Sequence, residues 1–321
     1  MTQVDAAVPV GGTTESAADS VVAPVSAKRM SRASKSFGSI GPLVVLIGII
    51  GGWYLLRLAI SEQRRFILPT PHEILTKGFI DGVSIGGLAG VVQKIASDLV
   101  PFVSFEPDLD RDVVLVDNLL AFWMTVKVSF VGLAIATVFA VIGAMIMSQA
   151  RVMEKAFFPY LVILQAVPIL AIVPLISVVF GFGFWSQVLV CILISFFPIV
   201  ANTLFGLKAA EPGQHDLFAL HHAGRWTKLR KLQIPAAMPA FFTAMRIAAG
   251  LSVIGAIVGG FFFSRGEKGL GSLLKGYASR PAFTPELYAT VILSSLLGIG
   301  VFLFFGWLGN KLIGKWSDQT V

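Results

Sequence analysis

The sequence is poor in charge and has almost no cysteine. Charged side chains make up 13% of its 321 residues, whereas ordinary soluble domains carry roughly 25%. The single cysteine, Cys191, excludes an intrachain disulfide. Hydrophobic residues make up 55% of the chain instead, and the mean hydropathy is +0.82. This composition excludes a soluble domain, a disordered chain and a disulfide scaffold, and it indicates an integral membrane protein.

Long apolar stretches divide the chain. A bilayer core takes roughly 20 apolar residues per helix. No charged residue occurs from Ala156 to Leu207, and Gly181 and Gly183 supply a turn that makes two spans of this stretch. The sequence therefore predicts an all-α integral membrane protein with six transmembrane helices, at residues 40–60, 119–147, 157–180, 185–206, 237–263 and 287–309.

Polar segments set the domain organisation. Residues 1–36 predict a disordered cytoplasmic tail, because small residues dominate there without apolar periodicity. Residues 37–321 form the transmembrane domain, with an outer-loop insertion at 80–115 and a loop at 207–236 that carries five Lys and Arg residues. Basic loops favour the cytoplasmic side, so this loop and both termini are expected there. The net charge of +7 is assigned to loops facing anionic membrane lipid, with no nucleic acid as a partner.

The 207–236 loop has the pattern of a short amphipathic helix on a basic stalk. Pro212 suits a first helical turn. Leu217 and Leu220, and less regularly Phe218, supply an apolar stripe, and Gly224 offers a break before a basic second segment. Such a helix can lie in a groove of a partner protein or on the lipid surface. The loop sequence by itself favours neither.

This loop resembles the EAA loop of inner-membrane permease subunits of binding-protein-dependent (type I) ABC importers, whose pattern is E-A-A-x3-G-x9-I-x-L-P. Asp216 takes the Glu position, and Leu217 with Phe218 takes the two Ala positions. Leu232-Gln233-Ile234-Pro235 takes the I-x-L-P positions. His222 falls on the motif glycine, and a glycine follows only at Gly224. The helix is therefore expected to run further, or to break later, than in the family.

Further segments resemble the same family in order along the chain. They are Phe66-Ile67-Leu68-Pro69-Thr70-Pro71, Gln165-Ala166-Val167-Pro168, Phe197-Pro198-Ile199 with Asn202-Thr203, Arg246-Ile247-Ala248, and Gly269-Leu270-Gly271. The branch resembled serves nitrate, taurine, aliphatic sulfonates, pyrimidine vitamin precursors and riboflavin. Within it, the stretch from Ser252 to Gly259 is most similar to the pyrimidine-precursor and riboflavin permeases.

The resemblance implies the type I ABC permease architecture and a multi-pass protein of the bacterial cytoplasmic (inner) membrane. It implies a homodimer of permeases that forms the solute path by alternating access. It also implies a cytoplasmic ABC ATPase dimer bound at the 212–235 loop and an extracytoplasmic solute-binding protein. This chain would bind no cofactor, since ATP and Mg belong to the ATPase. The nearest phosphate-loop match, Gly309-x4-Gly314-Lys315, has Trp316 where Ser or Thr is required, so the chain is predicted to be no enzyme.

Two sets of candidate site residues follow. The ATPase-coupling set is Asp216, Leu217, Phe218, Leu220, His221, His222, Gly224, Arg225 and Trp226. Prolines interrupt the third and fourth predicted spans, and kinks there can shape a cavity. The candidate path residues are Gln165, Pro168, Ser195 and Asn202. The alternative for these polar residues is hydrogen bonding between helices.

For several other features, the sequence allows a structural as well as a functional interpretation. Arg246 lies inside the fifth span, where it either serves function or reaches the inner interface or a neighbouring helix. Lys127 is predicted to be an interfacial anchor. The pair Gly255 and Gly259 permits close helix approach, within the subunit or across a dimer. The segment 264–286 is too polar to span and suits an outer gating or docking loop.

Three function classes remain to be compared. A permease for a pyrimidine vitamin precursor or riboflavin is favoured, with nitrate, sulfonate or taurine as alternatives. A self-contained secondary transporter would use an intramembrane acid, but the predicted spans contain no Asp or Glu. A membrane enzyme would need clustered nucleophile, base or metal ligands. His221 and His222 are adjacent, so on a helix they point about 100° apart and are not predicted to bind a metal together.

Overall fold

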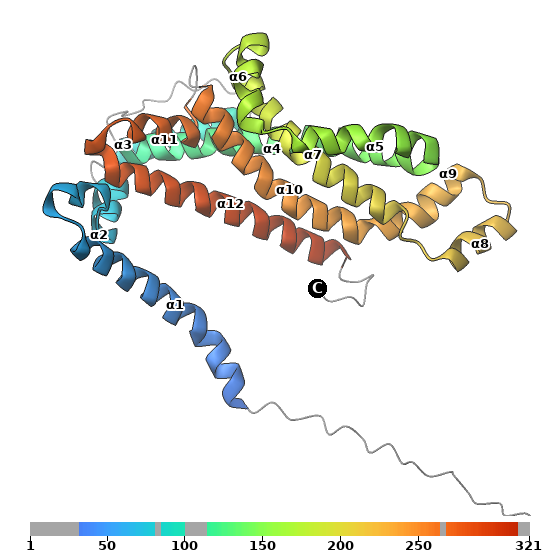
Figure 1. The fold of residues 1–321 in the computed structure, drawn as a ribbon, viewed down its shortest axis with the longest axis horizontal. Coiled ribbons are helices and arrows are strands. Elements are labelled where there is room, and N and C mark those ends of the chain that lie inside the picture. The colour runs from blue at the N-terminus through green and yellow to red at the C-terminus, as the bar shows by residue number, and fades with distance from the viewer. Residues whose placement is uncertain (1–31, 81–84, 100–113, 264–267, 314–321) are drawn as a thin grey trace, which may run out of the picture. The chain divides into compact units, whose positions relative to one another are not determined.

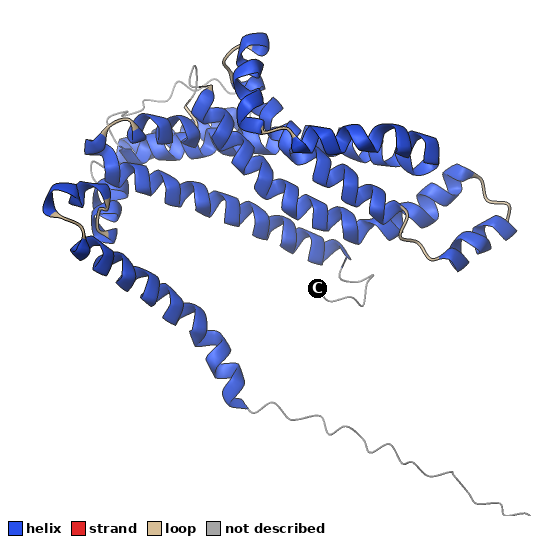
Figure 2. Cartoon of the chain, in the orientation of Figure 1, coloured by secondary structure: helices blue, strands red, loops and turns tan. Residues whose placement is uncertain are grey.

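The computed structural model describes residues 32–80, 85–99, 114–263 and 268–313, and every regular element in these ranges is helical (Figure 2). The chain divides into two compact units, Met1–Gly52 and Trp53–Val321. The described part of the first unit is the start of α1 (Arg32–Ala59). This helix begins inside the range predicted as a tail, while residues 1–31 lie outside the described part. Its stretch Pro42–Ala59 is long and apolar enough to cross a membrane.

Four long helices lie side by side in the second unit (Figure 1). They are α4 (Val114–Gln149), α7 (Phe184–Leu207), α10 (Ile234–Phe262) and α12 (Thr284–Ile313). Each is long and apolar enough to span a bilayer. Their central parts match the second, fourth, fifth and sixth predicted spans. Helices α4, α7 and α12 extend beyond both predicted ends, and α10 begins earlier than predicted but ends at Phe262. Asp117 and Glu286 therefore fall in the first turns of α4 and α12.

At Gly255 and Gly259, helix α10 lies so close to α7 that little room is left for a side chain at either position. A Cβ at Gly255 would lie 3.0 Å from the Cα of Cys191, and one at Gly259 would lie 3.2 Å from the Cα of Gln187. Small residues let membrane helices approach closely. Dispersion and weak backbone contacts then stabilise their association, because the hydrophobic effect does not favour a helix over equally apolar lipid. The two glycines therefore serve packing within the subunit, which decides between the two interpretations offered by the sequence.

The third predicted span is broken. Residues 157–180 were expected to form one helix, but the structure has α5 (Arg151–Ala166) and α6 (Ile169–Phe180) at 96° to each other. The break lies at Val167 and Pro168, both of which are extended. Proline lacks the amide proton for a helical bond and disfavours helical backbone in the preceding residue. The described part therefore has five span-length helices, and six if this bent pair counts as one span.

Short helices gather at the end of the bundle opposite α8 and α9 (Figure 1). Helix α3 (Ile85–Leu99) lies within the 80–115 insertion. Its Asp98 accepts bonds from Lys127 Nζ at 2.8 Å and from Trp123 Nε1 at 2.9 Å, both on α4. Burial raises the pKa of Asp98, but these bonds outweigh it and hold the pKa below its ordinary value. Lys127 is thus anchored by an ion pair to α3.

The segment 264–286, predicted to be a loop, contains α11 (Leu270–Ala278) and a short helix at Pro281–Phe283. The amide of Leu270 donates to Thr125 Oγ1 of α4 at 2.9 Å. Gly271 lies so close to α10 that a Cβ there would overlap the carbonyl oxygen of Ile257. Helix α11 is therefore packed against α4 and α10.

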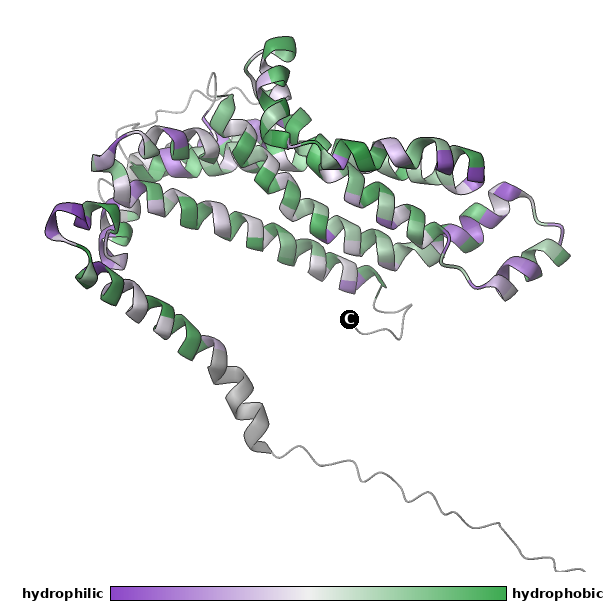
Figure 3. Cartoon of the chain, viewed as in Figure 1, coloured by the Kyte–Doolittle hydropathy of each residue, from purple (hydrophilic) through white to green (hydrophobic). Residues whose placement is uncertain are grey.

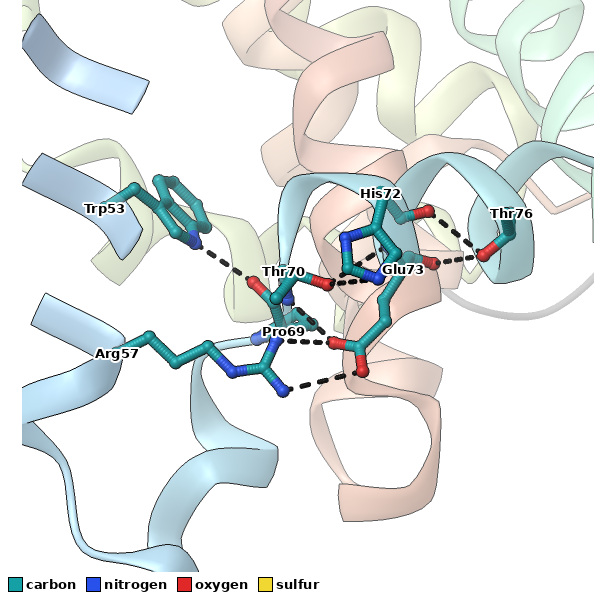
Figure 4. A network of polar contacts seen from close by, with 7 residues as sticks. All are labelled: Trp53, Arg57, Pro69, Thr70, His72, Glu73 and Thr76. Atoms are coloured by element: carbon teal, nitrogen blue, oxygen red, sulfur yellow. Dashed lines mark hydrogen bonds and ion pairs between the residues drawn. The ribbon is translucent and has the colours of Figure 1, made fainter. Parts of the chain in front are cut away.

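The connection after α1 is held by a polar network (Figure 4). It runs through short helices at Glu62–Ile67, α2 (Pro71–Leu75) and Thr76–Ile80. Trp53 Nε1 donates to the carbonyl of Pro69 at 3.0 Å, and Arg57 Nη1 pairs with Glu73 Oε2 at 2.8 Å. Thr70 and Glu73 form a capping box that starts α2. The bond from Arg57, then that from the Thr70 amide, lowers the pKa of Glu73 from 4.5 to about 2.

We expect this carboxylate to make the protein sensitive to acid. A depressed folded pKa gives stabilisation that is complete above pH 4.5 and is lost as the pH falls from about 4.5 to about 2. Glu73→Gln should therefore lower the thermal midpoint of the purified protein at pH 7, and the difference from wild type should vanish near pH 2. The control is Glu62→Gln, whose ion pair with Arg65 is exposed. Equal midpoints for wild type and Glu73→Gln across this range would contradict the assignment.

Candidate functional site

The loop between α7 and α10 contains a helix whose residues are all exposed or half-buried. Helix α8 (Pro212–Leu220) begins at Pro212, as predicted, with Glu211 as its N-cap. None of its residues is buried. Leu217 and Leu220 lie one turn apart on one face and are 53% and 78% exposed. The α8 ribbon in Figure 3 includes both hydrophilic and hydrophobic residues, and the exposed pair Leu217 and Leu220 gives the helix an apolar face.

The end of α8 explains the substitution at the motif glycine. His222 has a φ of 47°, in the left-handed region that favours glycine. Its amide bonds the carbonyl of Ala219 at 2.9 Å, and the amide of Ala223 bonds that of Phe218 at 3.0 Å. These two bonds are the Schellman motif, in which the left-handed residue is usually glycine. The helix thus ends at Leu220, and the expectation that it runs further toward Gly224 was wrong.

The stalk after α8 is helical and continuous with α10. Gly224 is the N-cap of α9 (Arg225–Lys228), and a π-helical turn at Leu229–Gln233 leads into α10 without a break. The whole length Arg225–Phe262 counts as one span-length helix. Arg225 and Trp226 are exposed at its start, whereas Leu229 and Leu232 are buried. The predicted basic stalk is therefore a rigid extension of the fifth span.

Two polar contacts hold the base of this loop. Lys208 at the end of α7 pairs with Glu154 of α5. The side-chain amide of Gln149, at the end of α4, donates to Gln233 Oε1 at 3.2 Å. The partners are 54 and 84 residues apart in the sequence. Sequence reasoning missed both contacts because no local pattern connects residues at such separations.

The four predicted path residues do not form one cluster. Gln165 and Pro168 are exposed at the break between α5 and α6. Ser195 is buried, and its hydroxyl donates to the carbonyl of Ala248 on α10 at 3.2 Å. Asn202 donates to the carbonyl of Pro198 on its own helix at 2.8 Å. Ser195 therefore makes the interhelical bond of the alternative interpretation, and Gln165 and Pro168 remain candidates for the path.

Helix α5 has no buried residue. Phe157, Tyr160 and Ile163 are 53%, 71% and 60% exposed.

Within the described residues no group of three or more His, Cys, Asp or Glu side chains is placed to bind a metal ion. Gly309, the start of the phosphate-loop match, lies inside α12, whereas Gly314, Lys315 and Trp316 lie outside the described part.

The backbone at position 222 can be tested by substitution. A non-glycine residue in the left-handed region costs of order 1–3 kcal/mol, and β-branched residues tolerate it worst. We expect His222→Val to unravel the end of α8 and to accelerate hydrogen exchange across 212–223 about tenfold. His222→Gly should leave it unchanged or slow it. The matched control is Gly224→Val, because φ there is −63° and nothing lies within 4 Å of an added Cβ. Equal exchange in His222→Val and wild type would refute the turn.

Comparison with known proteins identifies the family. The family model described as the inner membrane component of binding-protein-dependent transport systems matches residues 126–314, more than half of the chain. The chain is 35% identical over 193 residues to the formylaminopyrimidine transport permease protein ThiX of Halalkalibacterium halodurans, covering 59% of this chain and 74% of that protein. It is 33% identical over 171 residues to the riboflavin transport system permease protein RibX of Chloroflexus aurantiacus, covering 53% and 62%.

The fold has a counterpart among solved structures. A chain of the MetNI methionine ABC transporter, in inward-facing conformations, superposes with a TM-score of 0.50 at 17% identity, covering 62% of this chain and 95% of that one. The predicted fold class and family resemblance are thereby confirmed. The chain belongs to the inner membrane components of binding-protein-dependent transport systems, as a multi-pass permease subunit of an ABC importer, a family whose members work with an ATPase and a binding protein.

Proposed function

We propose that this permease passes solute by alternating access and couples to its ATPase through the 212–235 loop. One observation carries this proposal: α8 has no buried residue, exposes Leu217 and Leu220, and is followed after a short turn by a helix that is continuous with α10. An apolar helix face of this kind fits a groove on a partner protein. The coupling residues remain Asp216, Leu217, Phe218, Leu220, His221, His222, Gly224, Arg225 and Trp226.

The geometry supports a mechanical route from ATPase to membrane. A displacement of α8 acts on α9, which is continuous with α10, and α10 packs against α7, α4 and α12. Packed helices shift as units because their close-packed interfaces resist continuous deformation. When the ATPase pair closes, the two coupling loops of a dimer approach each other. The attached helices then tilt and open the central cavity to the outside, where the binding protein releases solute.

The second permease copy is proposed to cover α5. This helix contributes no buried residue, and large apolar side chains line it, including Phe157, Tyr160 and Ile163. A continuous exposed apolar surface of this kind is typical of a contact with a partner protein or with lipid. The break at Pro168 lies at the end of the same helix, so a homodimer through α5 would bring two such breaks to its path. The N- and C-termini are proposed to lie in the cytoplasm with the basic 207–236 loop.

The substrate is proposed to be a small organic solute such as a pyrimidine vitamin precursor or riboflavin. The similarity to ThiX and RibX supports this class, because these relatives are named as permeases for a formylaminopyrimidine and for riboflavin. The second candidate is an importer of the same class for nitrate, sulfonate or taurine. Its support is weaker, because the relative named for aliphatic sulfonates is only 28% identical to this chain.

Co-purification from native membranes in mild detergent tests the assembly. An ATPase at roughly equal copy number and a binding protein are expected, and a chain that elutes alone yet transports without ATP would refute the proposal.

Asp216→Lys tests the coupling site. Asp216 is exposed on α8, so reversing its charge should leave the membrane fold intact while it repels or misaligns the ATPase. We expect transport to fall at least about tenfold, the loss that follows when a charged interface contact worth about 1.4 kcal/mol is removed. The yield and thermal midpoint of the isolated permease should not change.

The matched control is Glu62→Lys, an equal charge reversal at an exposed position at the opposite end of the bundle. It should transport like wild type. Full transport and normal ATPase stimulation in Asp216→Lys would remove this residue from the coupling site.

A further inference from the structure

Arg246 of α10 lies in a notch on α12. Its guanidinium carbon is 4.1 Å from the centroid of the Phe302 ring, a cation–π distance. A Cβ at Gly306, about one turn further along α12, would lie 3.1 Å from Arg246 Nε and 3.2 Å from Cζ. Gly306 therefore leaves the space that the guanidinium fills. The guanidinium thus lies against α12, over the Phe302 ring and beside the backbone of Gly306.

No carboxylate neutralises this cation within the described residues. None of the ion pairs there includes Arg246, and its Nε is buried without a hydrogen-bond partner. Neither α1 nor a second copy supplies one at this depth, because no Asp or Glu occurs in residues 32–59, 118–149, 155–207, 234–262 or 287–313. An uncompensated guanidinium within a span is costly, and it is stable only with an anion or water in reach.

The depth of the notch indicates which anion can reach it. Trp307 follows Gly306 directly and is 56% exposed, and Lys311 Nζ lies 4.9 Å from its ring centroid. Exposed Trp with Lys is typical of the membrane–water interface. Gly306 precedes the last described residue of α12, Ile313, by seven residues, or about 10 Å of helix. Arg246 is thus close to the headgroup layer at the end of the bundle that carries the α8–α9 loop.

The surface beside the notch suits acyl chains. Leu303 and Phe304, on the turn of α12 that precedes Gly306, are 57% and 47% exposed, and Ile247 of α10 is 45% exposed. A phosphate at Arg246 would be followed by apolar side chains in the direction of the bilayer centre. A lipid satisfies both features, since its headgroup is an anion and its chains are apolar. A free solute anion would satisfy only the first.

We propose that Arg246 binds the phosphate of an anionic phospholipid in the leaflet on the side of the α8–α9 loop. The guanidinium donates charge-assisted hydrogen bonds to the phosphate, and Lys311 adds a second positive charge at the rim. The acyl chains lie along the exposed turn of α12. This site is separate from the coupling residues, so it does not depend on the proposed coupling mechanism.

The test uses the purified importer in nanodiscs made from equal parts of phosphatidylglycerol and phosphatidylcholine, with the co-purified lipid identified by native mass spectrometry. Wild type should retain phosphatidylglycerol. Arg246→Gln should reduce retention about tenfold, because a hydrogen bond to a charged group is lost. Gly306→Ala keeps every charge but adds a methyl group 3.1 Å from Arg246 Nε, so that the guanidinium must shift within the notch, and it should also reduce retention. This second variant keeps the test valid if Arg246→Gln fails to fold.

The matched control is Arg280→Gln. Arg280 also lies over a phenylalanine, with Cζ 5.9 Å from the Phe283 centroid, but at the opposite end of α12. It should retain phosphatidylglycerol like wild type. Unchanged retention in both Arg246→Gln and Gly306→Ala would overturn the proposal. So would a thermal stabilisation of lipid-free wild type by inorganic phosphate that equals the effect of phosphatidylglycerol and is lost in Arg246→Gln, because the ligand would then be a free anion.

Discussion

The seam between α7 and α10 supports the rest of the described bundle. Gly255 and Gly259 bring the two backbones together, and α10 also packs against α4, α11 and α12. Inside a bilayer the lipid is as apolar as the side chains, so helix association depends on close packing and on a few hydrogen bonds. The buried bond from Ser195 to the carbonyl of Ala248 adds such a contact across the same seam. Helix α10 is thus the common partner of the helices around it.

Because α10 packs against most of the bundle, its helical extension into the 212–235 loop connects that loop to the bundle. The loop is fixed at its base by Lys208 with Glu154 and by Gln149 with Gln233, whereas α8 itself touches little. The continuous helix that starts at Arg225 is therefore held at its base, and α8 lies beyond it with few contacts. The left-handed residue His222 ends α8 in a defined turn and sets the direction of the chain toward α9. A family motif whose glycine has been replaced therefore retains the backbone conformation for which that glycine is suited.

The unequal distribution of charge explains how the chain is held at its two ends. At the end with α2 and α3, acidic side chains meet basic partners, as in Arg57 with Glu73 and Lys127 with Asp98. These pairs fix short helices onto span ends, where desolvation is partial. At the other end, Arg246 has no carboxylate in reach within the described residues. Its surroundings are an aromatic ring, a glycine notch and apolar side chains, which is why a lipid is the natural counter-ion.

The sequence by itself determined the membrane class, the family, five of the six spans to within several residues, and the start of α8 at Pro212. These features depend on composition, apolar run length and local helix signals, all of which are properties of neighbouring residues. The tertiary structure decided the rest. It broke the third span at Val167 and Pro168, turned the segment after α10 into the packed helix α11, and assigned Gly255 and Gly259 to the inside of the subunit. The packing of α11 and of the two glycines depends on contacts between residues far apart in the chain, and such contacts leave no periodic pattern in the sequence. The break has a local cause in Pro168, but the length of the apolar run did not reveal it, because membrane helices also tolerate proline.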